Sequence, residues 1–186
     1  SQMNALNVAG SSGAWTGTVD IMKNGMVVQS ATPLDANTTF DRMLNQAKVG
    51  SNALAWNGPG LTSSMARDPN ISQRVTAVAV VLNRNQDGNP FLTSGKFDEV
   101  PDPNFAVTVD ISSVLVKYTF YGDSDLNGVV DERDLDLFTR GYTDQRSATP
   151  LGLHGWQWGD WDNNGTIDEQ DLDLFTAGYT KQGLVG

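Results

Sequence analysis

The chain has 186 residues with a formal net charge of −10, 39% hydrophobic residues and no cysteine. Its length suits one domain, or a core domain with a small appendage. The lack of cysteine excludes disulfides and thiol catalysis, and an acidic chain without a basic patch argues against a nucleic acid as partner. The longest apolar run, at 78–82, is far too short to span a bilayer.

Residues 1–120 are expected to form a small β-rich domain. Its first segment, residues 1–12, is mostly polar and small, and its apolar anchors are Met3, Leu6 and Val8. Two interpretations of this segment stay open. It is either a frayed terminus or a strand that adds to the exposed sheet edge of a neighbouring molecule.

Residues 17–30 predict a β-hairpin that turns at Asn24-Gly25, because both residues of this pair readily take positive φ. A helix is predicted next, over 38–48, where apolar residues recur at helical spacing. The signals for its start and its end are Asp35 or Asn37 and then Gly50.

A Gly/Pro-rich loop follows, with one helical turn predicted at 62–66. The β-branched run at 74–83 predicts a buried strand, and a long polar loop is expected over 86–104. Two further strands are predicted at 105–109 and 112–121. The second of them leads into the acidic part of the chain without a linker.

That acidic part contains the same 22-residue pattern twice, at 122–143 and 159–180. In each copy, oxygen-bearing side chains stand at positions 1, 3, 5, 9 and 12 of a loop, with glycine at position 6 and a backbone carbonyl at position 7. The candidate ligands are Asp123, Asp125, Asn127, Val129, Asp131 and Asp134 in the first copy, and Asp160, Asp162, Asn164, Thr166, Asp168 and Asp171 in the second. A short loop with this spacing surrounds a hard cation with about six or seven oxygens, so the pattern predicts two Ca²⁺ ions.

The distribution of charge favours the same interpretation. Residues 122–180 hold 13 acidic and 3 basic residues, a net charge of −10, and the rest of the chain is balanced with 9 of each. A solvated acidic surface is the alternative interpretation, but the acids stand at ligand offsets rather than in blocks. Two bound Ca²⁺ ions would bring the segment to about −6 and relieve the repulsion among its aspartates.

Short helices are predicted after the loops, at 134–142 and 171–179, and an irregular crossover at 143–158 joins the two copies. The shared pattern GDxDxNGxxDxxDLDLF resembles the type I dockerin family, whose members carry two tandem calcium loop–helix units with Asp at position 12. The resemblance covers 113–180 and implies that residues 121–186 form a double calcium-loop domain.

A looser resemblance extends further towards the N-terminus. The segments AWNGPGLTSS at 55–64 and SVLVKYTFYGDSDLNG at 113–128 look like a C-terminal region of large secreted proteins from environmental bacteria. This resemblance implies a secreted or cell-surface location and calcium use more than any activity. The chain is accordingly interpreted as a processed, mature form.

Residues at matching places in the two copies are candidates for contact with a partner. In dockerins, positions 10 and 11 of each loop contact the cohesin partner and are often small hydroxyl residues, whereas this chain has charged and amide residues there. The candidate partner-binding residues are Glu132, Arg133, Glu169 and Gln170 at these positions, together with Arg140 after the first loop and Trp156 and Trp158 of the crossover.

Trp156, Trp158 and Trp161 cluster before the second loop and allow two interpretations. They form either a platform for sugar stacking or partner contact, or a hydrophobic clasp that packs the crossover onto the core, and the clasp is preferred. His154 is the single histidine and no catalytic set surrounds it, so no enzymatic activity is expected.

The sequence as a whole therefore predicts an α+β fold, mainly β with short helices, in which the β-rich domain is continuous with a dockerin-like pair of calcium loop–helix units. The expected function is that of a non-enzymatic extracellular calcium-binding structural or assembly protein. Its partner would be another protein or a second copy, as in a surface polymer or filament. The alternatives are a carbohydrate-binding module that recognises a glycan, and a dockerin-type tether to a cohesin-like partner.

Overall fold

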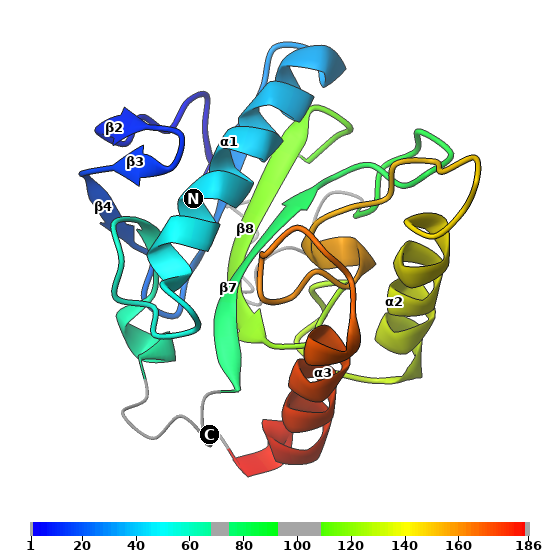
Figure 1. The fold of residues 1–186 in the computed structure, drawn as a ribbon. Coiled ribbons are helices and arrows are strands. Elements are labelled where there is room, and N and C mark those ends of the chain that lie inside the picture. The colour runs from blue at the N-terminus through cyan, green and yellow to red at the C-terminus, as the bar shows by residue number, and fades with distance from the viewer. Residues whose placement is uncertain (1, 68–74, 93–108, 185–186) are drawn as a thin grey trace, which may run out of the picture.

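The computed structural model describes residues 2–67, 75–92 and 109–184 of the chain (Figure 1). Helices account for 34% of the protein and strands for 20%, which confirms the predicted α+β class. Helix exceeds strand, although a mainly β chain was expected, because the first helix has 19 residues and two later helices have 13 each. Within the described residues, no helix is both long enough and apolar enough to cross a membrane.

The central sheet has four strands in the order β1-β5-β8-β7. Strand β8 (Ser113–Phe120) pairs antiparallel with both β5 (Gly25–Gln29) and β7 (Thr76–Leu82). At the edge, β1 (Gln2–Met3) pairs parallel with β5. Nearly every described residue of β5 and β7 is buried, so both faces of the sheet are covered. This burial explains why these strands are continuous apolar runs rather than alternating ones.

The predicted hairpin at 17–30 is wrong. Strand β4 (Thr18–Asp20) pairs parallel with β6 (Gly60–Thr62), while β5 belongs to the central sheet. The chain turns between them at Ile21, whose carbonyl accepts from the Asn24 amide at 3.0 Å. A third small sheet is formed by β2 (Gly10–Ser11) and β3 (Ala14–Trp15).

Helix α1 (Pro33–Ser51) starts earlier than predicted, because Thr32 is its N-cap. The Thr32 hydroxyl accepts from the Asp35 amide at 3.2 Å, and proline at the first helical position has a φ already suited to a helix. Gly50 does not end this helix as predicted. A Cβ on Gly50 would lie 1.7 Å from the Leu61 carbonyl oxygen, so glycine allows β6 to approach α1 closely.

The strands predicted at 74–83 and 112–121 are confirmed as β7 and β8, apart from their terminal residues. The helical turn predicted at 62–66 is the 3₁₀ turn η1 (Ser64–Ala66). Residues 105–108 of the strand predicted at 105–109, and most of the loop at 86–104, lie outside the described residues.

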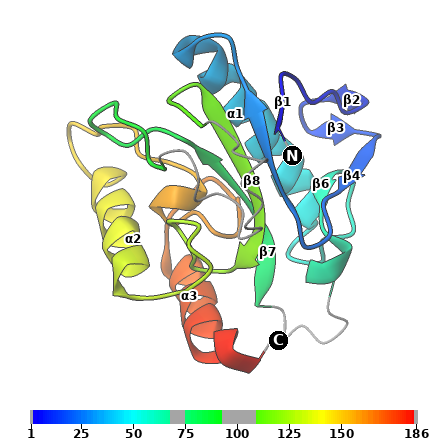
Figure 2. The same cartoon turned by 180° about the vertical axis from the view of Figure 1, so that it is seen from behind.

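The C-terminal part consists of α2 (Glu132–Asp144), η3 (Trp156–Trp158), α3 (Glu169–Lys181) and η4 (Gln182–Leu184). Figures 1 and 2 show α2 and α3 next to each other, to the right of β7 in Figure 1, whereas α1 lies to the upper left of β7 there. One continuous cluster of buried hydrophobic residues extends from β5 and α1 through β8 to α2 and α3. The acidic repeats are therefore packed on the sheet and share its core.

Candidate metal centres

Each acidic repeat brings three aspartates together. In loop 1 (residues 123–134), one carboxylate oxygen from each of Asp123, Asp125 and Asp134 lies within 4.8 Å of the other two. In loop 2 (residues 160–171), the same holds for the residues at identical positions, which are Asp160, Asp162 and Asp171. Aspartates at positions 1, 3 and 12 of each loop thus form a compact group of three carboxylates.

The fold of loop 1 is set by backbone amides that donate to these carboxylates. Asp134 accepts from the Ser124 amide at 2.8 Å with one oxygen and from the Asp131 amide at 2.9 Å with the other. Asp123 accepts from the amide of Gly128 at 3.0 Å. Gly128 has φ 87°, a conformation that favours glycine and folds the loop back toward its first residue.

Loop 2 repeats this geometry. Asp171 accepts from the Trp161 amide at 2.7 Å and from the Asp168 amide at 3.0 Å, and Asp160 accepts from the Gly165 amide at 3.1 Å. Gly165 has φ 93°. Two loops whose matching positions are 37 apart in the sequence therefore reach the same conformation, since each is determined by its own local residues.

One oxygen in loop 1 supports a bound cation. Asp123 is completely buried, and its Oδ1 atom has no hydrogen-bond partner among the described residues. A buried carboxylate oxygen without a partner carries a large desolvation cost unless a cation or a proton satisfies it. The residues present therefore fit a hard metal ion at the centre of the loop.

The raised pKa values of four loop aspartates likewise indicate that the protein groups of each loop supply too little positive charge for its carboxylates. Burial raises the pKa of Asp123 and Asp160 to about 6 and that of Asp134 and Asp171 to about 7, against an ordinary value of 3.8. Neighbouring carboxylates in each loop raise the pKa further, while backbone amides lower it.

Two of the predicted ligands have a different role in the structure. Asp131 and Asp168, at position 9, are the N-caps of α2 and α3 and accept from the Arg133 and Gln170 amides at 2.8 Å. They lie outside the carboxylate groups described above. Position 9 of such loops often reaches the ion through a water molecule, so a ligand role for these two stays a prediction.

The predicted ligands at positions 5 and 7 lie at the turn of each loop. The Asn127 side chain accepts from the Val129 amide at 2.7 Å and donates to Asp125 at 2.9 Å. Asn164 makes the same two bonds, at 2.7 Å with Thr166 and 2.9 Å with Asp162. These bonds order the turn, and whether the four residues coordinate a metal stays a prediction.

A lysine from the N-terminal part of the chain holds each loop. Lys117 of β8 donates to the Leu126 carbonyl of loop 1 at 2.8 Å, and Lys48 of α1 donates to the Asn164 carbonyl of loop 2 at 3.0 Å. Both lysines also lower the pKa of the first aspartate of their loop. The loops are thus fixed to both the sheet and α1.

Two glutamines that were not among the predicted site residues connect the repeats. Gln182, at the C-terminus of α3, contacts the backbone of Val130 in loop 1, and Gln145, at the C-terminus of α2, contacts the backbone of Ile167 in loop 2. A signal existed in the sequence, because Gln145 and Gln182 are separated by the same 37 positions as the two copies.

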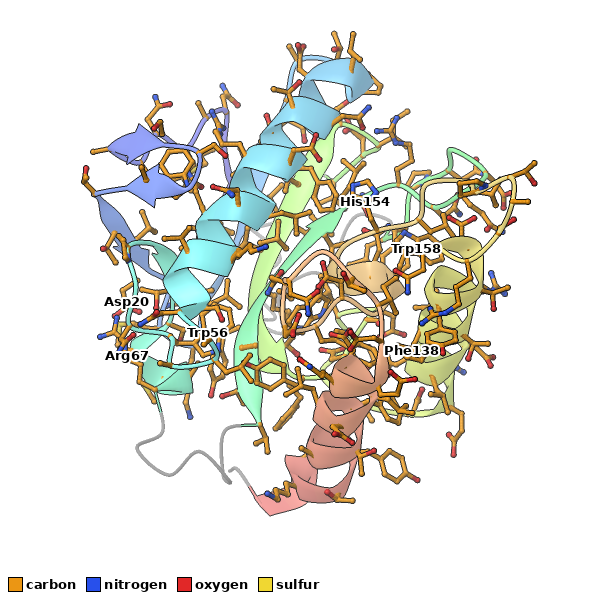
Figure 3. All side chains as sticks on the ribbon, in the orientation of Figure 1. Asp20, Trp56, Arg67, Phe138, His154 and Trp158 are labelled. Carbon is orange, nitrogen blue, oxygen red and sulfur yellow. The ribbon has the colours of Figure 1, made fainter. Side chains whose placement is uncertain are left out.

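The tryptophans form a buried clasp, and the assignment of Trp156 and Trp158 to partner binding is wrong. Trp156 and Trp161 have 0% exposure and Trp158, labelled in Figure 3, has 5%. The Trp156 indole donates to the Asp123 carbonyl at 2.7 Å, and that of Trp161 donates to the Ser124 hydroxyl at 3.2 Å. The crossover is thereby packed onto loop 1 rather than presented to solvent.

Trp161 is also the centre of a stack of five aromatic rings. Its ring lies 5.4 Å from Phe138 of α2 and 5.6 Å from Phe175 of α3, measured between centroids. Tyr142 and Tyr179 extend the stack at its two ends, at 5.6 and 5.9 Å. The stack joins both helices to the second loop with near-twofold symmetry.

The remaining candidate partner residues are exposed. They are Glu132, Arg133, Arg140, Glu169 and Gln170. All five lie on α2 or α3. They are free to contact another molecule, and their role in partner binding stays a prediction.

His154 lies beside α1 at the edge of a pocket of about 440 Å³ (Figure 3). Its Nε2 atom is 3.8 Å from Asp41, and its ring contacts Phe40 at 5.6 Å between centroids. The side chain is 62% exposed. This arrangement is a surface contact between the crossover and α1.

Comparisons with models of known protein families, with curated proteins and with solved structures found no match.

Proposed function

We propose that each loop binds one Ca²⁺ ion and that the protein is a non-enzymatic extracellular module whose repeats, stabilised by calcium, support association between proteins. The observation that carries the calcium proposal is the buried Oδ1 atom of Asp123, which has no partner in the described structure and lies in a group of three converging carboxylates. The dockerin-like pattern of both loops supports the same choice of ion.

The donor set favours calcium over other metals. Both groups of carboxylates offer oxygen alone, without histidine or cysteine, which is the preference of hard cations rather than of zinc or copper. Magnesium requires near-ideal octahedral geometry and keeps several waters, whereas calcium accepts irregular sites with many protein oxygens. A loop that combines three carboxylates with a candidate backbone carbonyl at position 7 suits calcium better.

Calcium would act as a structural ion. When bound, it supplies positive charge that satisfies the buried carboxylates of each loop. Extracellular sites of this type bind with dissociation constants of about 10⁻⁴ to 10⁻³ M, so they fill where calcium is near millimolar. At a concentration one hundred times the dissociation constant, each site would add about 2.7 kcal/mol to the free energy of unfolding.

A second copy of the chain is the partner we propose. The exposed residues at matching positions of α2 and α3 offer a symmetric surface for protein contact, and they equally allow a dockerin-type tether to a cohesin-like protein. The carbohydrate-binding alternative loses its main support, because the three tryptophans on which it depended are buried.

Calorimetric titration of chelator-treated protein with calcium tests the metal sites. We expect heat of binding for two sites, and loss of both in the double variant Asp123→Asn with Asp160→Asn. The matched control is Asp136→Asn with Asp173→Asn, which changes the same charge at exposed helical positions outside the loops. The absence of any heat, with an unchanged melting temperature, would contradict the proposal.

Light scattering after size-exclusion chromatography tests the assembly. We expect a larger mass in calcium than in chelator for the intact chain. A monomer under both conditions would refute self-association while leaving the metal sites in place.

A further inference from the structure

The edge of the central sheet is completed by the first residues of the chain. Strand β1 pairs with only two residues of β5, Gln2 with Val27 and Met3 with Val28, although β5 has five residues. It is the one parallel neighbour in the described central sheet, whose other pairs are antiparallel. Strand β5 is otherwise the outer strand on this side, and its Val27 and Val28 are buried.

The segment that carries β1 has few attachments to the rest of its own chain. Met3 and Leu6 are partly buried against the core, whereas residues 5–8 make no hydrogen bond in the described structure. Fixed backbone geometry begins at Ala9, whose carbonyl accepts from the amides of Thr16 at 2.8 Å and Gly17 at 3.0 Å. Residues 4–8 therefore connect a docked strand to a fixed point, as a hinge does.

We propose that β1 exchanges between copies, so that residues 1–8 of one molecule take the place beside β5 of the next. A strand with the sequence of β1 is known to fit this edge, because β1 of the same chain pairs with β5 there. A strand from a second copy would make the same contacts with Val27 and Val28, and exchange of an identical element is a low-cost route to association. This inference rests on the self-association proposed above.

The reach of the segment is sufficient for such exchange. Eight residues in extended conformation span up to about 27 Å, which is enough to pass from one molecule to a neighbour in contact with it. In one-way exchange the donor segment of one molecule pairs with the acceptor edge of the next, so the contact is head-to-tail. Unless it closes into a ring, a head-to-tail contact repeats into an open polymer.

The opposite edge of the sheet is less suited to accept a strand. Strand β7 is buried along six of its seven residues, and η1 and η3 pack against it. Within the described residues, the β5 edge is where one strand can leave and an equivalent strand can enter.

Cysteine trapping distinguishes exchange between chains from pairing within one chain. The protein has no cysteine. Met3 and Val28 are register partners, and neighbouring strands are about 4.8 Å apart, which is within the Cα range of a disulfide. Chains that carry Met3→Cys alone are mixed with chains that carry Val28→Cys alone, in the presence of calcium and a mild oxidant. The products are then separated by electrophoresis without reductant.

Exchange predicts disulfide-linked dimers that join one chain of each kind, identified by mass. The control mixes Ser11→Cys chains with Ala14→Cys chains, which are partners within the β2–β3 hairpin and should give no specific linkage between chains. A chain with both Met3→Cys and Val28→Cys should give a ladder of polymers. If the double variant forms only disulfides within single chains, in a sample that light scattering shows to be associated, the exchange is overturned.

Deletion of residues 1–8 gives a second test. We expect the larger mass seen in calcium to be lost while two calcium ions still bind. Association that persists after the deletion would overturn the exchange and leave the proposed function standing. An intact chain that stays monomeric in calcium would overturn both the exchange and the self-association proposed above.

Discussion

Gln182, at the C-terminus of α3, binds both backbone groups of Val130 in loop 1: its side-chain oxygen accepts from the Val130 amide at 2.7 Å and its amide nitrogen donates to the carbonyl at 2.9 Å. Gln145 of α2 binds Ile167 of loop 2 in the same way. Val130 and Ile167 both occupy position 8 of their loops. Each helix therefore supports the loop of the other repeat. These crossed contacts couple the two candidate metal centres structurally.

Replacement of Gln182 by methionine should weaken calcium binding at loop 1 although Gln182 is not a candidate ligand. The change removes two hydrogen bonds and leaves backbone groups of Val130 without partners, so we expect the free energy of unfolding to fall by about 1–3 kcal/mol. Urea denaturation and calcium titration measure the two effects. Gln170→Met, at an exposed position, is the control and should change neither. Unchanged calcium affinity in Gln182→Met would show that the crossed contacts do not couple the repeats.

Glycines make the close contact between helices and loops possible. A Cβ on Gly178 of α3 would lie 1.9 Å from the Tyr121 carbonyl oxygen, and one on Gly141 of α2 would lie 2.1 Å from that of Trp158. Gly178→Ala should therefore push α3 away from the end of β8, with a loss of about 1–3 kcal/mol or more in the free energy of unfolding. Thermal or urea denaturation measures it.

The control for that substitution is Gly183→Ala, since no atom lies within 4 Å of a Cβ built at Gly183. It should leave stability nearly unchanged. If Gly178→Ala unfolds at the same denaturant concentration as this control, the close approach of α3 to Tyr121 does not contribute to stability.

The part of the site that the sequence predicted is the part determined by local residues. The three carboxylates of each loop lie within 12 consecutive residues, and their convergence follows from position and from the glycine at position 6. The helices predicted after the loops are two residues short at each end, because Asp131 and Asp168, predicted as metal ligands, also cap the observed helices. The residues that carry this information are all near one another in the chain.

The parts that were missed depend on contacts distant in sequence. The pairing of β4 with β6 joins residues more than 40 positions apart, and the Asn24-Gly25 signal that favoured a hairpin was overridden by it. The burial of Trp156 and Trp158 likewise depends on α2 and loop 1 packing around them. The spacing of tryptophans in a sequence does not indicate whether their side chains are buried or exposed, so it could not decide between a platform and a clasp.

Substitution of Asp123 should have opposite effects with and without calcium. In metal-free protein, Asp123→Asn removes a buried carboxylate whose Oδ1 atom has no partner in the described part of the chain, so we expect the melting temperature to rise. In calcium the same change removes a candidate ligand, and the melting temperature should fall below that of the unchanged protein. Asp136→Asn is the control and should behave alike in both conditions. A decrease in both conditions would indicate that Asp123 acts in hydrogen bonding alone.

The stability of the metal-free protein should fall as pH rises. Burial raises the folded-state pKa of four loop aspartates to about 6 or 7 from the ordinary 3.8, so the folded form binds more protons than the unfolded form between these values. The stabilisation from these protons is complete below pH 3.8 and is lost as pH rises through 6 and 7. Asp20 and Asp144 have lowered pKa values, so they act in the opposite direction only at lower pH.

Thermal melting of protein passed over a chelating resin, at pH 5 and at pH 8, measures this dependence. We expect the higher melting temperature at pH 5 without metal. In saturating calcium the order should reverse, because protons compete with the ion for the same carboxylates. The double variant Asp123→Asn with Asp160→Asn is the control, and its metal-free melting temperature should vary less between the two pH values. If the metal-free protein is more stable at pH 8 than at pH 5, other protein groups already stabilise these carboxylates in their charged form. The proposed need for a cation would then be contradicted.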